Sequence, residues 1–206
     1  MKVLGSFTPK SKPLPAGLLK TYSTRDDLVF LLRHGQIPGG GKKRFLGITD
    51  LPLDRAGMDQ AQYWKAALKE ISFSGIYSSA LDRCRTTAGI IAGAHPVITE
   101  PRLNEIHLGD WENRTFERIK TDFPDAFNER GHNLDTFRPP GGESFLDLSE
   151  RVLPFFGTCL SPEAGSRLVI THAGVIRILL CHIKQIPVKR LFEFRPAYSQ
   201  LFVIEK

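Results

Sequence analysis

Five side chains with catalytic potential each stand at, or shortly after, the end of a short apolar segment. They are Arg33, His34, Arg83, Glu105 and His172. Guanidinium groups offer forked donors that match phosphate oxygens, and a neutral imidazole is a competent nucleophile near neutral pH. A carboxylic acid can protonate a departing alkoxide, while a second, protonated imidazole can add positive charge. This set of groups predicts phosphoryl transfer without a metal, because positioning and charge neutralisation supply most of that catalysis.

The apolar segments predict the strands that would position these side chains. Short runs rich in Val, Ile and Phe indicate buried strands, which we expect at 28–34, 75–79, 96–100, 167–173 and 199–206. Helical patterns separate them, so the sequence predicts a three-layer α/β fold with a mostly parallel sheet. Ligands of such sheets bind outside the carboxyl ends of the strands. The five side chains are therefore expected to converge at one edge of the sheet.

Two of the predicted helices have a clear apolar face. The first follows Asp54, a candidate N-cap, and its face comprises Met58, Ala61, Trp64, Leu68 and Ile71. The second begins near residue 143, and its face comprises Phe145, Leu148, Val152 and Phe155. Pro154 should end or bend this second helix. A third helix, over 82–94, is expected to turn Ile90 and Ile91 inward.

Length and charge indicate one domain with a short appendage. The chain has 206 residues and a net charge of +6, and half of that excess lies in residues 1–27. We interpret 1–27 as an N-terminal arm, flexible or docked, and 28–206 as the catalytic domain. Residues 101–141 are polar and rich in proline, which predicts an irregular insertion over the active site.

Composition excludes several other classes of protein. Three widely spaced cysteines favour neither a disulfide framework nor a zinc site, so a cytoplasmic location is expected. No apolar stretch approaches the length of a membrane span, and the N-terminus has too short an apolar run for a signal peptide. No basic stripe studded with aromatic residues indicates nucleic-acid binding. We expect a small phosphomonoester as the partner and no cofactor or metal. The sequence does not indicate the oligomeric state, although an oligomer is possible.

Several residues compete with the main candidates or extend them. Arg85 should face away from Arg83 on the same helix, and Asp110 and Glu112 are rivals of Glu105 as proton donor. Glu143 either orients an arginine of the site or has no role there. The segment "GGGKKR" fails as a phosphate loop, because no Ser or Thr follows its lysines. Lys42, Lys43 and Arg44 either form a solvated loop or draw anionic substrates to the mouth of the site.

Four motifs carry a resemblance to a known family. "LLRHG", "SSALDRCRTTA", "LNEIHLGDWE" and "ITHAG" occur in this order, and they resemble the motifs of the histidine phosphatase superfamily, the phosphoglycerate mutase-like proteins, from about residue 28 to 205. The resemblance implies that His34 becomes phosphorylated and that Glu105 donates the proton. It implies a phosphate- and substrate-binding set of Arg33, Gln36, Arg83, His172, Ala173, Gly174 and Glu143.

Within this family the chain looks closest to the α-ribazole phosphatase branch, which implies a role in cobalamin biosynthesis. The segments "RLNEIHLGDWE" and "PPGGESFLDLSERV" carry that likeness. The chain departs from the family pattern at Gln36, Ile37 and Asn113, which stands where glycine is usual. The alternatives are a phosphoglycerate mutase or a sugar-phosphate phosphatase on the same site, a non-catalytic module that binds phosphorylated ligands, and a zinc hydrolase. Mutase activity is less expected, because the insertion is short beside that of the mutases.

Overall fold

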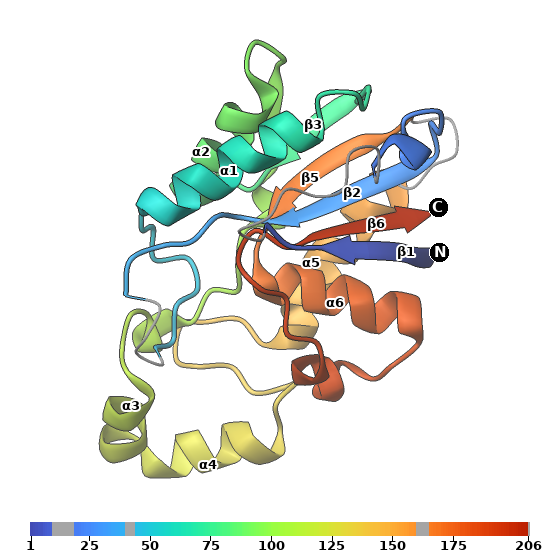
Figure 1. Ribbon diagram of the computed structural model, residues 1–206. Helices are drawn as coiled ribbons and strands as arrows, with labels where there is room; N and C mark the ends of the chain where they lie inside the picture. Colours follow the sequence, from blue (N-terminus) through green and yellow to red (C-terminus); the bar gives the residue numbers. More distant parts are fainter. Residues whose placement is uncertain (10–18, 40–43, 160–164, 206) are drawn as a thin grey trace.

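The computed structural model describes residues 1–9, 19–39, 44–159 and 165–205. Its centre is a six-stranded sheet with the order β1-β6-β2-β5-β3-β4 (Figure 1). The strands are β1 (Lys2–Phe7), β2 (Leu28–Arg33), β3 (Gly75–Ser78), β4 (Val97–Thr99), β5 (Arg167–Thr171) and β6 (Leu201–Glu205). The run β2-β5-β3-β4 is parallel, whereas β6 pairs antiparallel with both β2 and β1. The fold is thus the predicted α/β architecture, with a mixed sheet.

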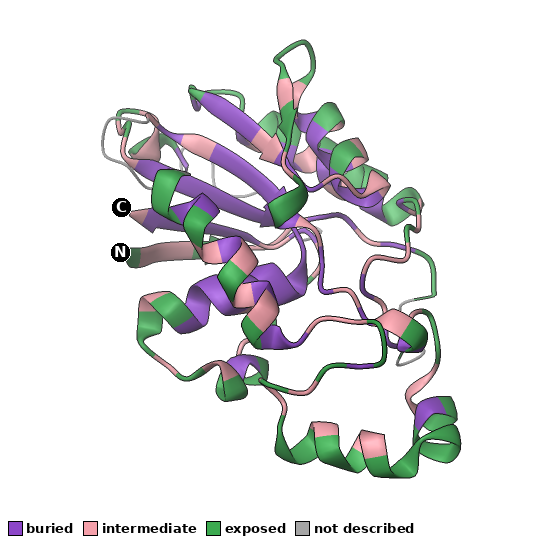
Figure 2. Cartoon of the chain, turned by 180° about the vertical axis from the view of Figure 1, so that it is seen from behind, coloured by how far each residue is buried: buried purple, intermediate pink, exposed green. Residues whose placement is uncertain are grey.

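Helices cover both faces of the sheet. α1 (Arg55–Ala67) and α2 (Asp82–Ala92) lie on one face, and α5 (Phe145–Cys159) and α6 (Ala173–Lys184) lie on the other (Figure 1). Side chains of β2 alternate between them: Phe30 and Leu32 pack on the α1 side, and Val29 and Leu31 pack on the α5 side. The central strands are accordingly buried along most of their length (Figure 2). This two-sided burial explains why β2 reads as a continuous apolar run.

The middle section contains more regular structure than its sequence predicts. Two helices occur there, α3 (Phe116–Asp122) and α4 (Pro124–His132), together with the 3-10 helices η2 (Pro101–Leu103) and η3 (Gly109–Trp111). The prediction of an irregular segment over 101–141 is therefore wrong at these residues. Both α-helices are short and mostly exposed, so they lack a long apolar face to reveal them. Phe116 stacks on Phe45 with a ring separation of 4.1 Å, which anchors this section to the chain before α1.

The beginning of the N-terminal arm is a strand of the sheet. β1 pairs along β6 from Lys2 opposite Glu205 to Phe7 opposite Leu201. The first residues of the arm are thus docked, and the arm continues through the 3-10 helix η1 (Lys20–Tyr22). Residues 10–18 lie outside the described part of the chain. Near the other end, the 3-10 helix η5 (Val188–Glu193) leads from α6 toward β6.

Most of the local helix predictions are confirmed. Asp54 caps α1 by accepting a hydrogen bond from the Gly57 amide, at 2.8 Å. The predicted apolar face of α5 is buried throughout, but the helix continues through Pro154 to its end at Cys159. Met58 was expected in the core and is instead 44% exposed. Within the described residues, no helix is long and apolar enough to cross a membrane.

Candidate active site

His34 lies just beyond the end of β2, where the sheet presents it to a cavity. Its backbone amide donates to the Thr171 carbonyl, and its carbonyl accepts from the Ser199 amide, each at 3.0 Å. The Nδ1 atom of the ring is 2.7 Å from the Gly35 carbonyl. Since a carbonyl only accepts, the proton sits on Nδ1 and the lone pair on Nε2. Burial, followed by the charges of Arg33 and Arg83, holds the pKa of His34 well below 6.5, so the ring is neutral.

Gly35 lies against the start of α1. A Cβ at this position would come 2.5 Å from the Gly57 carbonyl. Glycine is therefore required so that the loop after His34 can pack directly against the backbone of α1.

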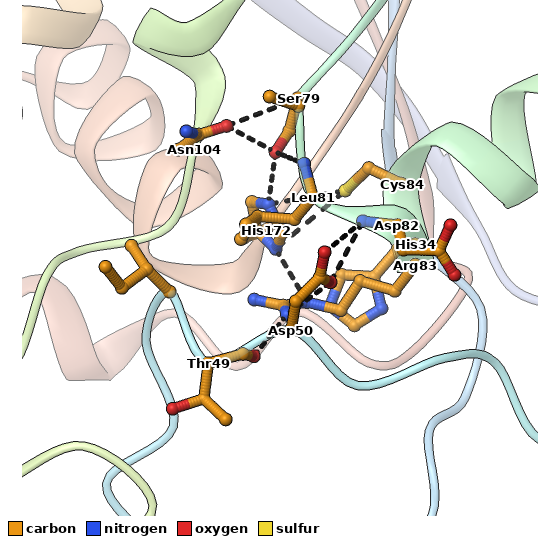
Figure 3. A network of polar contacts seen from close by, with 12 residues as sticks. His34, Thr49, Asp50, Ser79, Leu81, Asp82, Arg83, Cys84, Asn104 and His172 are labelled. Atoms are coloured by element: carbon orange, nitrogen blue, oxygen red, sulfur yellow. Dashed lines mark hydrogen bonds and ion pairs between the residues drawn. The ribbon is translucent and has the colours of Figure 1, made fainter.

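Arg83, in the first turn of α2, is fixed by three hydrogen bonds to the protein. Nη2 donates to the Gly47 carbonyl at 2.7 Å, Nη1 donates to the Thr49 carbonyl at 2.8 Å, and Nε donates to His172 Nδ1 at 3.2 Å (Figure 3). Asp50 adds a longer ion pair at 3.7 Å. Two of the five guanidinium protons remain for a ligand. The arginine is thus held in place before any anion arrives.

His172 lies behind Arg83 and beside the nucleophile. Its ring centroid is 5.1 Å from that of His34, so the two imidazoles meet as predicted. Nε2 is 2.8 Å from Ser79 Oγ, which in turn donates to Asn104 Oδ1 (Figure 3). With Nδ1 accepting from Arg83, the proton of this ring lies on Nε2.

The charge expected on His172 is not supported by its surroundings. Burial and the neighbouring charge of Arg83 hold the pKa of His172 well below 6.5. The ring is therefore neutral rather than protonated, and it does not form part of the cavity wall among the described residues. Its ring nitrogens contact Arg83, Ser79 and Cys84, and direct contact with a phosphate stays a prediction.

Glu105 projects into the same cavity from the loop after η2. Its carboxylate accepts from the amide of Ile106 at 3.1 Å and from that of Gly174 at 3.0 Å, in the first turn of α6. A Cβ at position 174 would lie 2.1 Å from Glu105 Oε1. Gly174 was predicted to bind phosphate, but its amide is occupied by Glu105 here. Its neighbour Ala173 does line the cavity.

The rival glutamate, Glu112, is committed to a structural task. Its oxygens accept hydrogen bonds from the amides of Gly47, Ile48 and Thr49, from the Thr49 hydroxyl, and from the amide of Leu108. Burial alone would raise its pKa, but these bonds lower the pKa of Glu112 below its ordinary value. Glu112 therefore stays ionised and holds the loop 47–49, whose carbonyls bind Arg83. This leaves Glu105 as the better placed acid.

Glu143 orients an arginine that the sequence did not single out. It forms a two-pronged ion pair with Arg151 of α5, with both contacts at 2.9 Å. Arg151 also donates to the carbonyls of Arg102 and Asn104, and to that of Glu105 at 3.3 Å. The pair thus fastens the segment that carries Glu105. Contact between Glu143 and substrate stays a prediction.

The cavity beside His34 has a volume of about 680 Å³ and a strongly cationic wall. Four guanidinium groups and one carboxylate line it: Arg33, Arg44, Arg83, Arg177 and Glu105. Arg33 lies over the ring of Tyr198 at 3.9 Å, and Tyr198 also lines the cavity. Neither Tyr198 nor Arg177 was predicted. The available signal for Arg177 was a single charged side chain within the apolar segment 173–181 of α6.

Three further predicted residues lie apart from this wall or outside the described residues. Gln36 does not line the cavity: its side-chain Nε2 donates to Asp54 Oδ2 at 3.0 Å, at the cap of α1. Its role in binding substrate is therefore still a prediction. Lys42 and Lys43 lie outside the described residues. Among the described residues, no cluster of three or more side chains could hold a metal ion.

A neutral histidine beside a cationic cavity, at the carboxyl edge of an α/β sheet, is suited to phosphoryl transfer. The family comparison agrees with this class. Residues 29–205 match the model of the histidine phosphatase superfamily, branch 1. The chain belongs to this superfamily, and it is an enzyme of the phosphatase type.

Similar proteins carry different names within the family. "Probable phosphoglycerate mutase GpmB" of Escherichia fergusonii is 33% identical over 162 residues, which is 77% of this chain and 75% of that protein. The α-ribazole phosphatase of Shigella flexneri superposes with a TM-score of 0.76 at 26% identity, over 83% and 86% of the two chains. A mycobacterial glucosyl-3-phosphoglycerate phosphatase superposes with a TM-score of 0.73 at 27% identity, over 86% and 91%. The fold alone therefore does not identify the substrate.

Proposed function

We propose that this enzyme hydrolyses phosphomonoesters through a phosphohistidine on His34, without a metal. The observation that carries the proposal is the state of the His34 ring. The Gly35 carbonyl fixes its proton on Nδ1, and none of the described residues hydrogen-bonds Nε2. The nucleophilic lone pair is thus available at a cavity that Arg33 and Arg83 line with positive charge.

In the first step, His34 Nε2 attacks phosphorus in line with the leaving oxygen. A P–N bond forms while the P–O bond breaks, and Glu105 gives its proton to the departing alkoxide. Arg33 and Arg83 neutralise the phosphoryl oxygens. His172 orients Arg83 by accepting a hydrogen bond from its Nε atom. If the ligand breaks that hydrogen bond, His172 contacts the phosphate itself.

In the second step, water attacks the phosphohistidine from the side that the leaving group has vacated. Glu105, now a carboxylate, takes a proton from the water as the new P–O bond forms. The P–N bond breaks, its electron pair returns to Nε2, and inorganic phosphate departs. The Glu143–Arg151 pair keeps Glu105 in place for both steps.

Phosphoenzyme trapping tests this function. The enzyme should release nitrophenolate from p-nitrophenyl phosphate in the presence of a strong chelator, and brief reaction with labelled substrate should leave acid-labile phosphate on the protein. His34→Ala should abolish both. His95→Ala is the matched control, because His95 is exposed, lies outside the cavity and has its Nδ1 atom 3.0 Å from the Pro96 carbonyl. Turnover that persists in His34→Ala, or that vanishes with the chelator, would overturn the proposal.

The substrate candidates follow from motifs and relatives. α-Ribazole 5′-phosphate is supported by the motif resemblance and by the Shigella neighbour, and it would place the enzyme in cobalamin biosynthesis in the cytoplasm. Phosphoglycerate mutase activity is supported by the 33% identical relative. A panel of phosphorylated metabolites, assayed with and without bisphosphoglycerate, separates hydrolysis from mutase activity.

A further inference from the structure

The cavity holds more positive charge than a phosphoryl group requires. Arg33 and Arg83 lie beside His34 and match the two charges of a phosphate monoester. Arg44 and Arg177 line the same cavity, and Glu105 is the one carboxylate among its described lining residues. Glu105 lies near Arg177, but within the described residues neither Arg44 nor Arg177 forms an ion pair, so both guanidinium groups remain able to bind a further anion once the phosphoryl group is bound.

Arg177 is well placed to meet a ligand. It lies one helical turn beyond Gly174, which binds Glu105, and on the same face of α6. Nε donates to the Phe194 carbonyl at 3.0 Å, and the guanidinium lies 4.9 Å above the Phe192 ring. These contacts fix the group and leave both Nη atoms without a hydrogen bond from the described residues. Burial lowers the pKa of Arg177, and the nearby charge of Glu105 partly opposes this.

Arg44, in the wall of the cavity, is held by Asn113, a residue that is unusual at this position in the family. Its Nη1 donates to the Asn113 carbonyl at 2.9 Å and to Asn113 Oδ1 at 3.1 Å. Asn113 has a φ of 58°, in the left-handed region, which explains why glycine is usual at this position. Arg44 forms no ion pair within the described part of the chain. Asparagine thus adopts a backbone conformation suited to glycine and gains a contact that orients Arg44.

The remaining outer wall is largely apolar. It includes Ile37, Pro38, Leu46, Leu51 and Phe116. Such a wall offers few other polar partners, and it strengthens an electrostatic contact by excluding water. A leaving group without charge could accept hydrogen bonds from the outer guanidinium groups but would not neutralise them.

We propose that Arg44 and Arg177 form a second anion-binding subsite, which selects phosphomonoesters whose leaving group carries a carboxylate or a second phosphate. This inference rests on the proposed function and narrows its substrate class. α-Ribazole 5′-phosphate, whose nucleoside leaving group lacks negative charge, would then be a poor substrate.

Matched substrate pairs test the subsite. 3-Phosphoglycerate and glycerol 3-phosphate differ in one carboxylate, and fructose 1,6-bisphosphate and fructose 6-phosphate differ in one phosphate. The wild-type enzyme should release phosphate with at least about tenfold higher kcat/KM from the more anionic member of one pair, the usual contribution of a charged hydrogen-bonded pair. The pair that shows the preference identifies the anion. Equal values within both pairs would overturn the subsite.

Variants assign the preference to residues. Arg177→Met and Arg44→Met should each reduce the preference about tenfold, whereas Arg177→Lys should retain most of it. Asn113→Gly keeps the backbone conformation and removes one contact to Arg44, so it should reduce the preference less. Arg85→Met is the control for lost charge, because Arg85 is exposed on α2 outside the cavity. A preference that survives both methionine variants would overturn the assignment.

The two proposals fail in distinguishable ways. If p-nitrophenyl phosphate is not turned over in a His34-dependent manner, the proposed function itself is wrong. If it is turned over but the arginine variants affect both members of each pair alike, only the second subsite is wrong.

Discussion

Replacing Gly174 by alanine should disable the proton donor while leaving the phosphoryl-binding groups in place. The new Cβ would lie 2.1 Å from Glu105 Oε1, whereas ordinary contacts begin at 3.4 Å. The carboxylate must therefore retreat by roughly 1 Å and lose its hydrogen bond from the Gly174 amide, and a displacement of that size costs on the order of 100-fold in rate. We expect this loss in kcat/KM for alkyl phosphates, whose alkoxides need a proton to depart.

The assay compares an alkyl phosphate with p-nitrophenyl phosphate. Nitrophenolate departs without a proton, so its release should fall far less. Gly157→Ala in α5 is the matched control, since a Cβ there meets nothing within 4 Å, and both variants should melt as cooperatively as the wild type. Equal losses on the two substrates would show that the Gly174 amide binds phosphate, as the motif suggested. No loss on either would refute the placement of Glu105.

Two further perturbations probe the charges of the site. Glu112→Gln should lower kcat/KM about tenfold on alkyl and aryl phosphates alike, because it loosens the loop 47–49 that holds Arg83. Steady-state kinetics on both substrates measure this loss. A loss confined to alkyl phosphates would contradict the expected role of Glu112. The acid limb of kcat/KM should lie below 6.5, since burial and the adjacent arginines lower the pKa of His34. Below 6.5 the unfolded chain binds protons that folded His34 and His172 do not, so stability should fall with acidification by up to about 1.4 kcal/mol per pH unit for each histidine. A pH–rate profile and urea unfolding at several pH values test both expectations.

The inner part of the site could be predicted because it depends on short-range features. Arg33 ends the apolar strand β2, and His34 directly follows it. A strand that is buried on both faces appears in the sequence as a continuous apolar run. The carboxyl ends of parallel strands share one edge, so His172, at the end of β5, had to lie near His34. β2 and β5 are neighbours in the sheet, and the two rings that follow them lie 5.1 Å apart.

The residues that the sequence did not reveal depend on contacts between distant segments. Tyr198 reaches the site because the chain before β6 folds back beside β2, which pairs with β6 antiparallel. The task of Glu112 depends on a loop more than sixty positions earlier in the chain. The helices α3 and α4 were not predicted, because short exposed helices are stabilised by packing and show no helical spacing of apolar residues. None of these features leaves a local pattern.

The contacts that fix Arg83 beside His34 suggest which part of the cavity selects the substrate. Arg83 is fixed by carbonyls of the loop that Glu112 binds and by His172, which is itself held by Ser79. Donors that are oriented in advance stabilise a phosphoryl group without reorganising, and they do so for any phosphomonoester. They therefore contribute rate and little discrimination. Under the proposed function, selection among leaving groups falls to the outer wall, where Arg44 and Arg177 form no ion pair with the described residues.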